Sequence, residues 1–475
     1  MLSLVAFVVV VASIVVWSLV RPNFALAVVL CLFALDQWAG IAHPLFASRS
    51  WIINVLLAGV VAAAVARDLL RGRRARIRVS KTFLLVLILY TYAWVSNQWS
   101  PYGPQRWIEL LPYLVLYLGL APVLVREIGD LRTPLLGFLA MGALVLVALL
   151  AFAEFGRRGL IVQIAGVAEE TPPLALGQFA GTVLLAYVFL RTTEYKRAFL
   201  IAKPVVIVLA LVMIFKSGSR GQLFGVVATV LIVGPLVATG GPVQRYGKML
   251  FLLAAIIALI WISFDLSGVG AYRWDVGQSG AGTINSGAEG RVSMWSTMLA
   301  AWYSDPLTLV FGLGNSASYT GALLNGSYPH NVPIEVLTEE GMLGFGLYVV
   351  AILAVLNSFR KLKSRFQNDS QTLAYLGFLF ALFVYNFLLS IKQGALVGND
   401  ALLMFLAGII LGNLSAATSG LRPLGPKRKV RCGNAGHRVV GDLPRRRSAG
   451  REGRRTISAG LDGGEIVRDA TRAAE

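Results

Sequence analysis

Residues 249–262 have the sequence MLFLLAAIIALIWI and contain no charged side chain. Apolar stretches of this kind recur along the 475-residue chain, and between them the basic residues gather in short clusters such as RDLLRGRRARIRVSK at 67–81. A transmembrane helix needs roughly 20 mostly apolar residues. The alternation of apolar stretches and basic clusters therefore predicts a chain that crosses a membrane many times.

The composition favours the same class of protein. Hydrophobic residues make up 56% of the chain and charged residues 14%, with a mean hydropathy of +0.70, which lies outside the usual range of soluble domains. The net charge of +19 comes mostly from clusters between apolar stretches and from the tail after Arg422, so we expect no nucleic-acid partner. Cys31 and Cys432 predict no disulfide framework, and three histidines in all predict no metal site.

About thirteen segments are long and apolar enough to span a bilayer. The prediction is an all-α integral membrane protein with about 12–13 transmembrane helices and one large, partly helical periplasmic loop. No cleavage site follows the first apolar segment, so we expect it to be retained. The predicted spans lie near residues 3–20, 23–40, 51–68, 82–99, 107–125, 133–154, 174–191, 197–215, 221–238, 248–265, 336–357, 373–391 and 399–416.

The distribution of basic residues predicts the orientation, because Lys and Arg accumulate in cytoplasmic loops. Every second connection is basic, and the other connections are then expected to face outward. In a bacterium this predicts a multi-pass inner-membrane protein with its active site toward the periplasm. Trp99 and Trp107, which flank one outer connection, are expected to be aromatic anchors at the interface. The basic connections are 67–81, 126–132, 191–197, 245–248 and 360–365, and the outward ones lie around Pro101, Glu169, Ser219, 267–333 and Gly394.

These patterns divide the chain into five parts. N-terminal transmembrane helices occupy residues 1–80, a transmembrane core 81–266, a large outer loop 267–333, C-terminal transmembrane helices 334–416, and a basic tail 417–475. The tail has few large apolar side chains and is expected to be disordered. Its basic residues could attract anionic lipid head groups, at about 1 kcal/mol each near the surface, or could lack a specific partner.

The connection at 267–333 is unlike the others, because it holds about 65 residues and many aromatic side chains. Long loops in compact proteins are usually functional or disordered, and the aromatic residues favour an ordered cap. Trp295 and Trp302 recur at helical spacing with the apolar residues between them. This spacing predicts a short amphipathic helix that begins near Gly290 and is opened by Arg291.

The loop ends in YPHNVPIEVLTEEG at 328–341. Asn331 and Pro333 are typical of a helix start, and Glu335 lies in the first predicted turn. His330 would then sit just above a helix N-terminus, where unpaired N–H groups and the helix dipole attract anions.

Two arginines are candidates for anion binding. SGSRG at 217–221 places Arg220 at the outer end of a predicted span, and Arg291 lies in the large loop. Guanidinium groups can engage phosphate oxygens bidentately, so the two could hold a diphosphate without a metal. Arg220 could instead be an interfacial anchor. The segment GLGN at 312–315 lacks the Gly-Lys-Ser/Thr ending of a nucleotide-binding loop, so we expect a turn there.

Several segments resemble one family. HNVPIEVLTEEGMLGFG at 330–346 resembles the HNxxL…ExGxxG signature of the O-antigen ligase and polymerase superfamily, with Ile334 where the signature has Leu. SGSRG and GRVSMW resemble the two arginine motifs of that family. SNQWSPYGPQRWIELLPYLVLYL at 96–118 is similar to its first outer loop and following span. The resemblance covers roughly residues 80–415, and thirteen spans depart from the usual twelve.

The resemblance implies a metal-independent glycosyltransferase without a cofactor. Such a protein moves a glycan from undecaprenyl diphosphate to a hydroxyl of a glycan or lipid acceptor, with membrane lipids as its other partners. Arg220 and Arg291 would bind the diphosphate leaving group and stabilise its charge. His330 would accept the acceptor's proton or hold that hydroxyl in line. Asn331 and Glu339 are further candidates for substrate binding, and Glu339 could orient His330, pair with an arginine, or have a structural role.

Three functions stay open at this point. A ligase would join the glycan to a lipid or protein acceptor, whereas a polymerase would add repeat units to another lipid-linked chain. The two share the same leaving-group chemistry, and we favour the ligase. A polysaccharide or lipid transporter or flippase would also have about a dozen spans. Transporters usually show internal repeats and broken spans that carry charges near the midplane, and neither is evident in this sequence.

Overall fold

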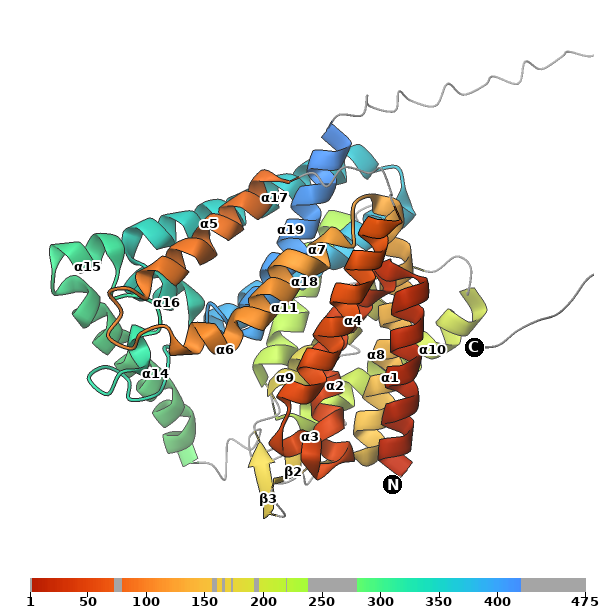
Figure 1. The fold of residues 1–475 in the computed structure, drawn as a ribbon, viewed down its shortest axis with the longest axis horizontal. Helices are drawn as coiled ribbons and strands as arrows, with labels where there is room; N and C mark the ends of the chain where they lie inside the picture. Colours follow the sequence, from red (N-terminus) through yellow and green to blue (C-terminus); the bar gives the residue numbers. More distant parts are fainter. Residues whose placement is uncertain are drawn as a thin grey trace, which may run out of the picture. The chain divides into compact units, whose positions relative to one another are not determined.

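The computed structural model describes residues 2–71, 79–155, 160–164, 167–171, 174–191, 196–218, 220–237 and 280–419. Helices make up nearly all of the secondary structure of these residues (Figure 1). By their contacts, residues Met1–Pro423 form one compact unit that contains every described residue. From residue 420 onward, the predicted tail lies outside the described residues.

The apolar helices follow the predicted spans closely. Among the described residues, nine helices are long and apolar enough to cross a bilayer, and three shorter ones are also apolar. The tenth predicted span, near 248–265, lies outside the described residues. The chain is therefore a mainly α-helical, multi-pass membrane protein as far as its described residues extend. The elements are η1 (Pro22–Phe24), α1 (Leu2–Val20), α2 (Ala25–Ala42), α3 (Pro44–Ser48), α4 (Trp51–Leu70), α5 (Lys81–Ser96), α6 (Gln105–Leu114), η2 (Val115–Leu120), α7 (Ala121–Val123), η3 (Ile128–Leu131), α8 (Arg132–Phe152), α9 (Leu174–Phe189), α10 (Lys196–Lys216), α11 (Arg220–Val237), α17 (Gly341–Phe366), α18 (Ser370–Lys392) and α19 (Asn399–Ser419).

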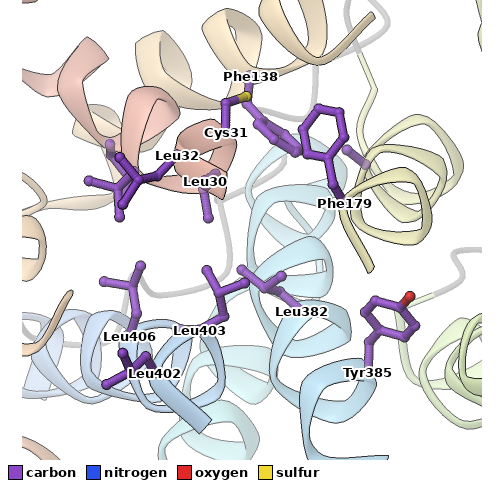
Figure 2. Packing of buried hydrophobic residues seen from close by; sticks show 14 of the residues in the cluster. Leu30, Cys31, Leu32, Phe138, Phe179, Leu382, Tyr385, Leu402, Leu403 and Leu406 are labelled. Carbon is purple, nitrogen blue, oxygen red and sulfur yellow. The ribbon is translucent and has the colours of Figure 1, made fainter. Parts of the chain in front are cut away.

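The most buried helices are α2, α9, α18 and α19, and their apolar side chains point toward one another in the core (Figure 2). These helices are apolar on all faces, which is typical of helices that are surrounded by other helices. Phe359 of α17 stacks on Phe380 of α18 with ring centroids 3.8 Å apart. By contrast, α1 and α17 each keep a row of exposed apolar side chains, which a bilayer would cover.

Connections that were predicted to share a side of the membrane contact one another. At one end of the bundle, Arg126 forms an ion pair with Asp68 at 2.7 Å. The Gln371 amide at that end donates to the Arg191 carbonyl at 2.9 Å. Each pair joins two of the connections that the basic clusters predict to be cytoplasmic. The alternate connections meet at the other end, which carries the candidate site described below; which end faces outward stays a prediction.

The Arg126–Asp68 pair is buried, with 7% and 5% of the two side chains exposed. Removing one partner of a buried ion pair typically costs about 3–5 kcal/mol. We therefore expect Arg126→Gln to lower the unfolding temperature of the purified protein clearly, as measured by intrinsic fluorescence. Arg71→Gln, which changes an exposed arginine at the end of α4, is the matched control. Equal unfolding temperatures for the two variants would contradict a structural role of the pair.

A small antiparallel sheet departs from the all-helical prediction. It consists of β1 (Glu154–Phe155), β2 (Leu160–Ile164) and β3 (Val167–Thr171), with Ile161 opposite Glu170. The connection around Glu169, predicted only as an outer loop, therefore contains strands. Its β-branched residues suit a pleated strand, but the segment is too short for the apolar periodicity that identified the helices.

The large outer loop is partly helical, with α14 (Gly280–Tyr303), α15 (Pro306–Phe311), η4 (Ala317–Tyr319) and α16 (Val332–Glu339). The helix predicted to begin near Gly290 begins at Gly280 instead, so Arg291 lies inside it rather than opening it. The sequence GAGTINSGA at 280–288 consists largely of poor helix formers. Helix propensity therefore does not predict that the helix begins as early as Gly280. Residues 267–279 lie outside the described part of the loop.

The helix predicted to run from Pro333 through 357 is divided in two. The first part, α16, ends at Glu339, and α17 begins at Gly341. Gly341 has φ +67°, and a Cβ there would collide with the backbone of Val310 and Gly312. Glu339 and Glu340 therefore lie at a corner between two helices rather than along one helix.

Candidate functional site

His330 lies directly before the first turn of α16. The Asn331 side chain caps this helix, since its Oδ1 accepts from the Ile334 N–H at 3.0 Å, and Pro333 follows in the first turn. His330 itself has φ +56°, which is uncommon for a residue other than glycine. Such backbone conformations occur often at functional sites.

Three segments hold His330 in place. Its ring packs against that of Tyr328, with centroids 4.1 Å apart. The His330 side chain also lies near the Gln393 backbone, just after α18, and the Tyr328 hydroxyl donates to the Gln393 carbonyl at 3.0 Å. From α14, the Trp295 indole N–H donates to the Pro329 carbonyl at 2.8 Å. The side chain is therefore fixed by the outer loop on one side and by the helical bundle on the other.

Arg291, on α14, lies near the His330 side chain. It precedes Trp295 by four residues, so the two lie on one face of the helix. Burial lowers the pKa of His330 below its usual range, and the positive charge of Arg291 lowers it further, against the opposing effect of the nearby Gln393 backbone. His330 is therefore mainly neutral at pH 7 and can accept a proton.

The third predicted residue, Arg220, is the first residue of α11; its side chain lies outside the described part. Gln222, two residues further, is buried and donates to the Gln393 side chain at 3.3 Å and to the Leu174 carbonyl at 3.2 Å. Gln393 thus connects the SGSRG segment to Tyr328 and His330. The structure brings the three predicted motifs to one end of the bundle.

Lys392 is a basic residue of this region that the sequence reasoning did not single out. Its side chain lies directly against Gly221, where any Cβ would overlap it. The glycine after Arg220 therefore leaves room for the Lys392 side chain against the start of α11.

Three glutamates are buried beside the site, and their hydrogen bonds run to loop segments. Glu339 accepts from the backbone N–H groups of Ser316 and Ser318 at 2.6 and 3.0 Å. Glu340 accepts from the Asn315 amide at 2.8 Å, and Glu335 from the Leu396 N–H at 3.2 Å. Among the alternatives for Glu339, these contacts support a structural role, since they hold residues 316–318 rather than His330.

The GLGN segment packs against the same corner. The N–H groups of Leu313 and Gly314 donate to the carbonyls of Thr338 and Glu339, both at 2.9 Å. Gly314 has φ +89°, and a Cβ there would lie 2.5 Å from the Ser100 Cα. A hydrogen-bonded turn begins only at Gly314, whose carbonyl accepts from the Ala317 N–H at 3.2 Å, so the predicted turn lies two residues later in the chain. The segment joins the first outer connection to the end of α16.

Burial raises the pKa of Glu340 to about 8, and it also raises those of Glu335 and Glu339. A carboxyl with a raised folded-state pKa binds more protons in the folded than in the unfolded chain between pH 4.5 and 8, so stability falls as pH rises through that window. We expect Glu340→Gln to remove much of this loss, as measured by chemical unfolding at pH 6 and pH 9. Glu109→Gln, at an exposed position of α6, is the control, and its stability should depend on pH as that of wild type does.

Arg106 of α6 is the site residue that sequence reasoning missed. Its guanidinium lies 3.9 Å from the centroid of the Tyr319 ring. Tyr319 stacks on Tyr328 at 6.1 Å, and Tyr328 packs on His330. An aromatic row thus joins Arg106 to His330. The available signal was an arginine at the outer end of a predicted span, inside the quoted segment 96–118.

The neighbouring tryptophans have different roles. Trp99 is 42% exposed, in keeping with an interfacial position. Trp107 is only 4% exposed and its indole donates to the Asn315 side chain. The prediction of a membrane-interface anchor is therefore wrong for Trp107, which ties α6 to the outer loop.

In the described part of the chain, no group of three or more His, Cys, Asp or Glu side chains is arranged to hold a metal ion. No family model and no curated protein matched this sequence.

Proposed function

We propose that this protein is a membrane glycosyltransferase of the O-antigen ligase type. It would move a glycan from undecaprenyl diphosphate to an acceptor hydroxyl at the outer face of a bacterial inner membrane, during the synthesis of cell-surface polysaccharide. The observation that carries the proposal is the meeting of His330, Arg291 and the segment after Arg220 around Tyr328 and Gln393.

The chemistry assigns one task to each group. The acceptor oxygen attacks the anomeric carbon while the bond from that carbon to the diphosphate oxygen breaks, and the electron pair leaves with the diphosphate. His330, neutral at pH 7, takes the proton of the acceptor hydroxyl. Arg291 and Arg220 stabilise the negative charge that grows on the leaving group. Asn331 caps α16 and so fixes the position of His330.

The direct test is transfer by the purified protein in proteoliposomes. These are supplied with an undecaprenyl-diphosphate glycan and candidate lipid, glycan or protein acceptors, with a chelator present throughout. The proposal expects a glycosylated acceptor and released undecaprenyl diphosphate. A single transferred glycan per acceptor indicates a ligase, and a ladder of lengthening products indicates a polymerase. Absence of diphosphate release with every acceptor would contradict both.

A further inference from the structure

The short helix α15 belongs to the outer loop but has the composition of a helix that faces lipid. Its sequence, PLTLVF at 306–311, contains no charged side chain. Asp305 caps the first turn by accepting from the Leu307 N–H at 3.0 Å, and Gly312 ends the helix with φ +81°. Local chemistry therefore fixes both ends of α15 and leaves an apolar helical turn between them.

One side of α15 is apolar and uncovered. Leu307, Val310 and Phe311 are 66%, 44% and 44% exposed. Residues three and four apart lie on the same side of a helix, so these three side chains form one surface, the apolar face of α15. Leu309, on the opposite side of the helix, is partly buried. The helix therefore packs on the protein with one side and presents the apolar face of α15 to its surroundings.

The apolar face of α15 continues the lipid-facing surface of α17. The two helices pack against each other, and the backbone of Val310 and Gly312 lies directly against Gly341, where α17 begins (Figure 1). From there α17 presents a row of exposed apolar side chains that includes Met342 and Leu353. This helix is long and apolar enough to cross a bilayer, which would cover that row. Lipid next to the beginning of α17 would therefore also reach α15.

Aromatic residues of α5 mark the same level of the molecule. The Tyr92 hydroxyl donates to the Phe311 carbonyl at 3.0 Å, and the Tyr92 ring lies 6.3 Å from the ring of Trp99. Tyrosine and tryptophan gather at the boundary between the hydrocarbon core of a bilayer and water. The end of α15 therefore lies at that boundary, on the side of the bundle that carries the candidate site.

We propose that α15 lies on the bilayer surface, with the apolar face of α15 inserted into the leaflet next to the candidate site. A helix with one apolar side is suited to this position in the plane of the interface. A second protein could also cover such a face, but it would have to displace lipid from the adjoining row of α17. The leaflet is therefore the occupant that the neighbouring surface favours.

The proposed contact would fix one end of α14 at the membrane. The Thr308 hydroxyl of α15 donates to the Trp302 carbonyl at 2.7 Å, and the Trp302 indole donates to the Leu309 carbonyl at 3.3 Å. Trp302 belongs to α14, the helix that carries Arg291 near His330. Lipid bound to α15 would thus hold the Arg291 helix in place through Trp302.

Spin labels test the lipid contact without any transfer. Cys31→Ala and Cys432→Ser remove the native thiols, and a nitroxide is attached at Leu307→Cys in nanodiscs. Its collisions are measured with oxygen, which concentrates in hydrocarbon, and with a neutral nickel chelate, which stays in water. The ratio of oxygen to nickel collisions should exceed several-fold that at Ala322→Cys, in an exposed turn of the same loop. Leu353→Cys, at a 56% exposed position of α17, supplies the ratio for a lipid-facing label.

Two results would overturn the lipid contact. A ratio at Leu307→Cys equal to that at Ala322→Cys would place α15 in water. Few collisions with either reagent would show that protein covers this face instead of lipid. Phe311→Cys repeats the measurement at the other end of the helix, and it decides the matter if the unfolding temperature shows that Leu307→Cys is misfolded.

The link to Arg291 has a separate test, which rests on the proposed function. A carboxylate is unfavourable in the apolar part of a bilayer. Leu307→Asp should therefore release α15 and lower the rate of glycan transfer several-fold, whereas Ala322→Asp should transfer like wild type. An unchanged rate for Leu307→Asp would overturn the link between the leaflet and Arg291. Lipid contact at α15 in a protein that never transfers a glycan would support the membrane position of α15 and overturn the glycosyltransferase.

Discussion

His330→Ala should lower the rate of glycan transfer by about 10²- to 10⁴-fold, because a positioned general base contributes that much to a reaction of this kind. The substitution removes a half-buried side chain that packs on Tyr328 beside the Gln393 backbone and lies outside the apolar helices. We therefore expect the variant to fold and to bind undecaprenyl diphosphate normally. The measurement is kcat in the proteoliposome assay, with binding and unfolding temperature recorded on the same preparation.

His43→Ala is the matched control. His43 is an exposed histidine that caps α3 through its Nδ1, so its loss should leave the transfer rate unchanged. His330→Asn then separates the two roles considered for His330. Asparagine can hold a hydroxyl in line but cannot take its proton. If His330 is the general base, the rate of His330→Asn should therefore be as low as that of His330→Ala. Transfer by His330→Ala at the wild-type rate would remove this residue from the mechanism.

Arg291→Gln is expected to reduce kcat by about 10²- to 10³-fold, the usual effect of losing one preorganised group that stabilises developing negative charge. Arg291→Lys should recover only part of the rate, because an ammonium cannot engage phosphate oxygens in the bidentate geometry of a guanidinium. Arg49→Gln, which changes an exposed arginine after α3, serves as the control. A wild-type rate for Arg291→Gln would contradict the leaving-group role.

Arg291→Gln should also change the pH dependence of the transfer rate. His330 is active when neutral, and burial together with the Arg291 charge lowers its pKa below 6.5. The midpoint of the acid limb of wild type should therefore lie below pH 6.5, where His330 becomes protonated. Loss of the Arg291 charge raises the pKa of His330, so the acid limb of kcat/KM for Arg291→Gln should move to higher pH. An acid limb that stays in place would place Arg291 too far from His330 to act on it.

Features that depend on a short stretch of chain were predictable. The apolar helices follow from segment length and hydropathy, which need no partner to be recognised. The Asn331 cap also follows from local residue preferences, as does a turn close to GLGN, although that turn begins at Gly314 rather than Gly312. The start of α14 was misplaced because residues 280–288 are poor helix formers.

The layout of the candidate site could not be obtained in this way. Trp107 meets Asn315, and Arg106 meets Tyr319, across about two hundred residues of chain. No periodicity in either segment indicates the other, since such contacts depend on how the helices pack. The division between α16 and α17 at Gly341 could not be predicted locally either. It depends on the Val310 and Gly312 backbone, which lies too close to Gly341 to leave room for a Cβ.

The sequence alone therefore predicted a multi-pass, mainly helical membrane protein and the positions of the apolar helices that the structure describes. It also singled out the three motifs on which the proposed function rests. Tertiary structure decided which of these groups meet. It assigned Glu339 to the backbone of residues 316–318 and set Arg106 on the row that leads to His330. The physical reason is that hydropathy and capping act over a few neighbouring residues, whereas a buried hydrogen bond or a stacked ring depends on segments that only packing brings together.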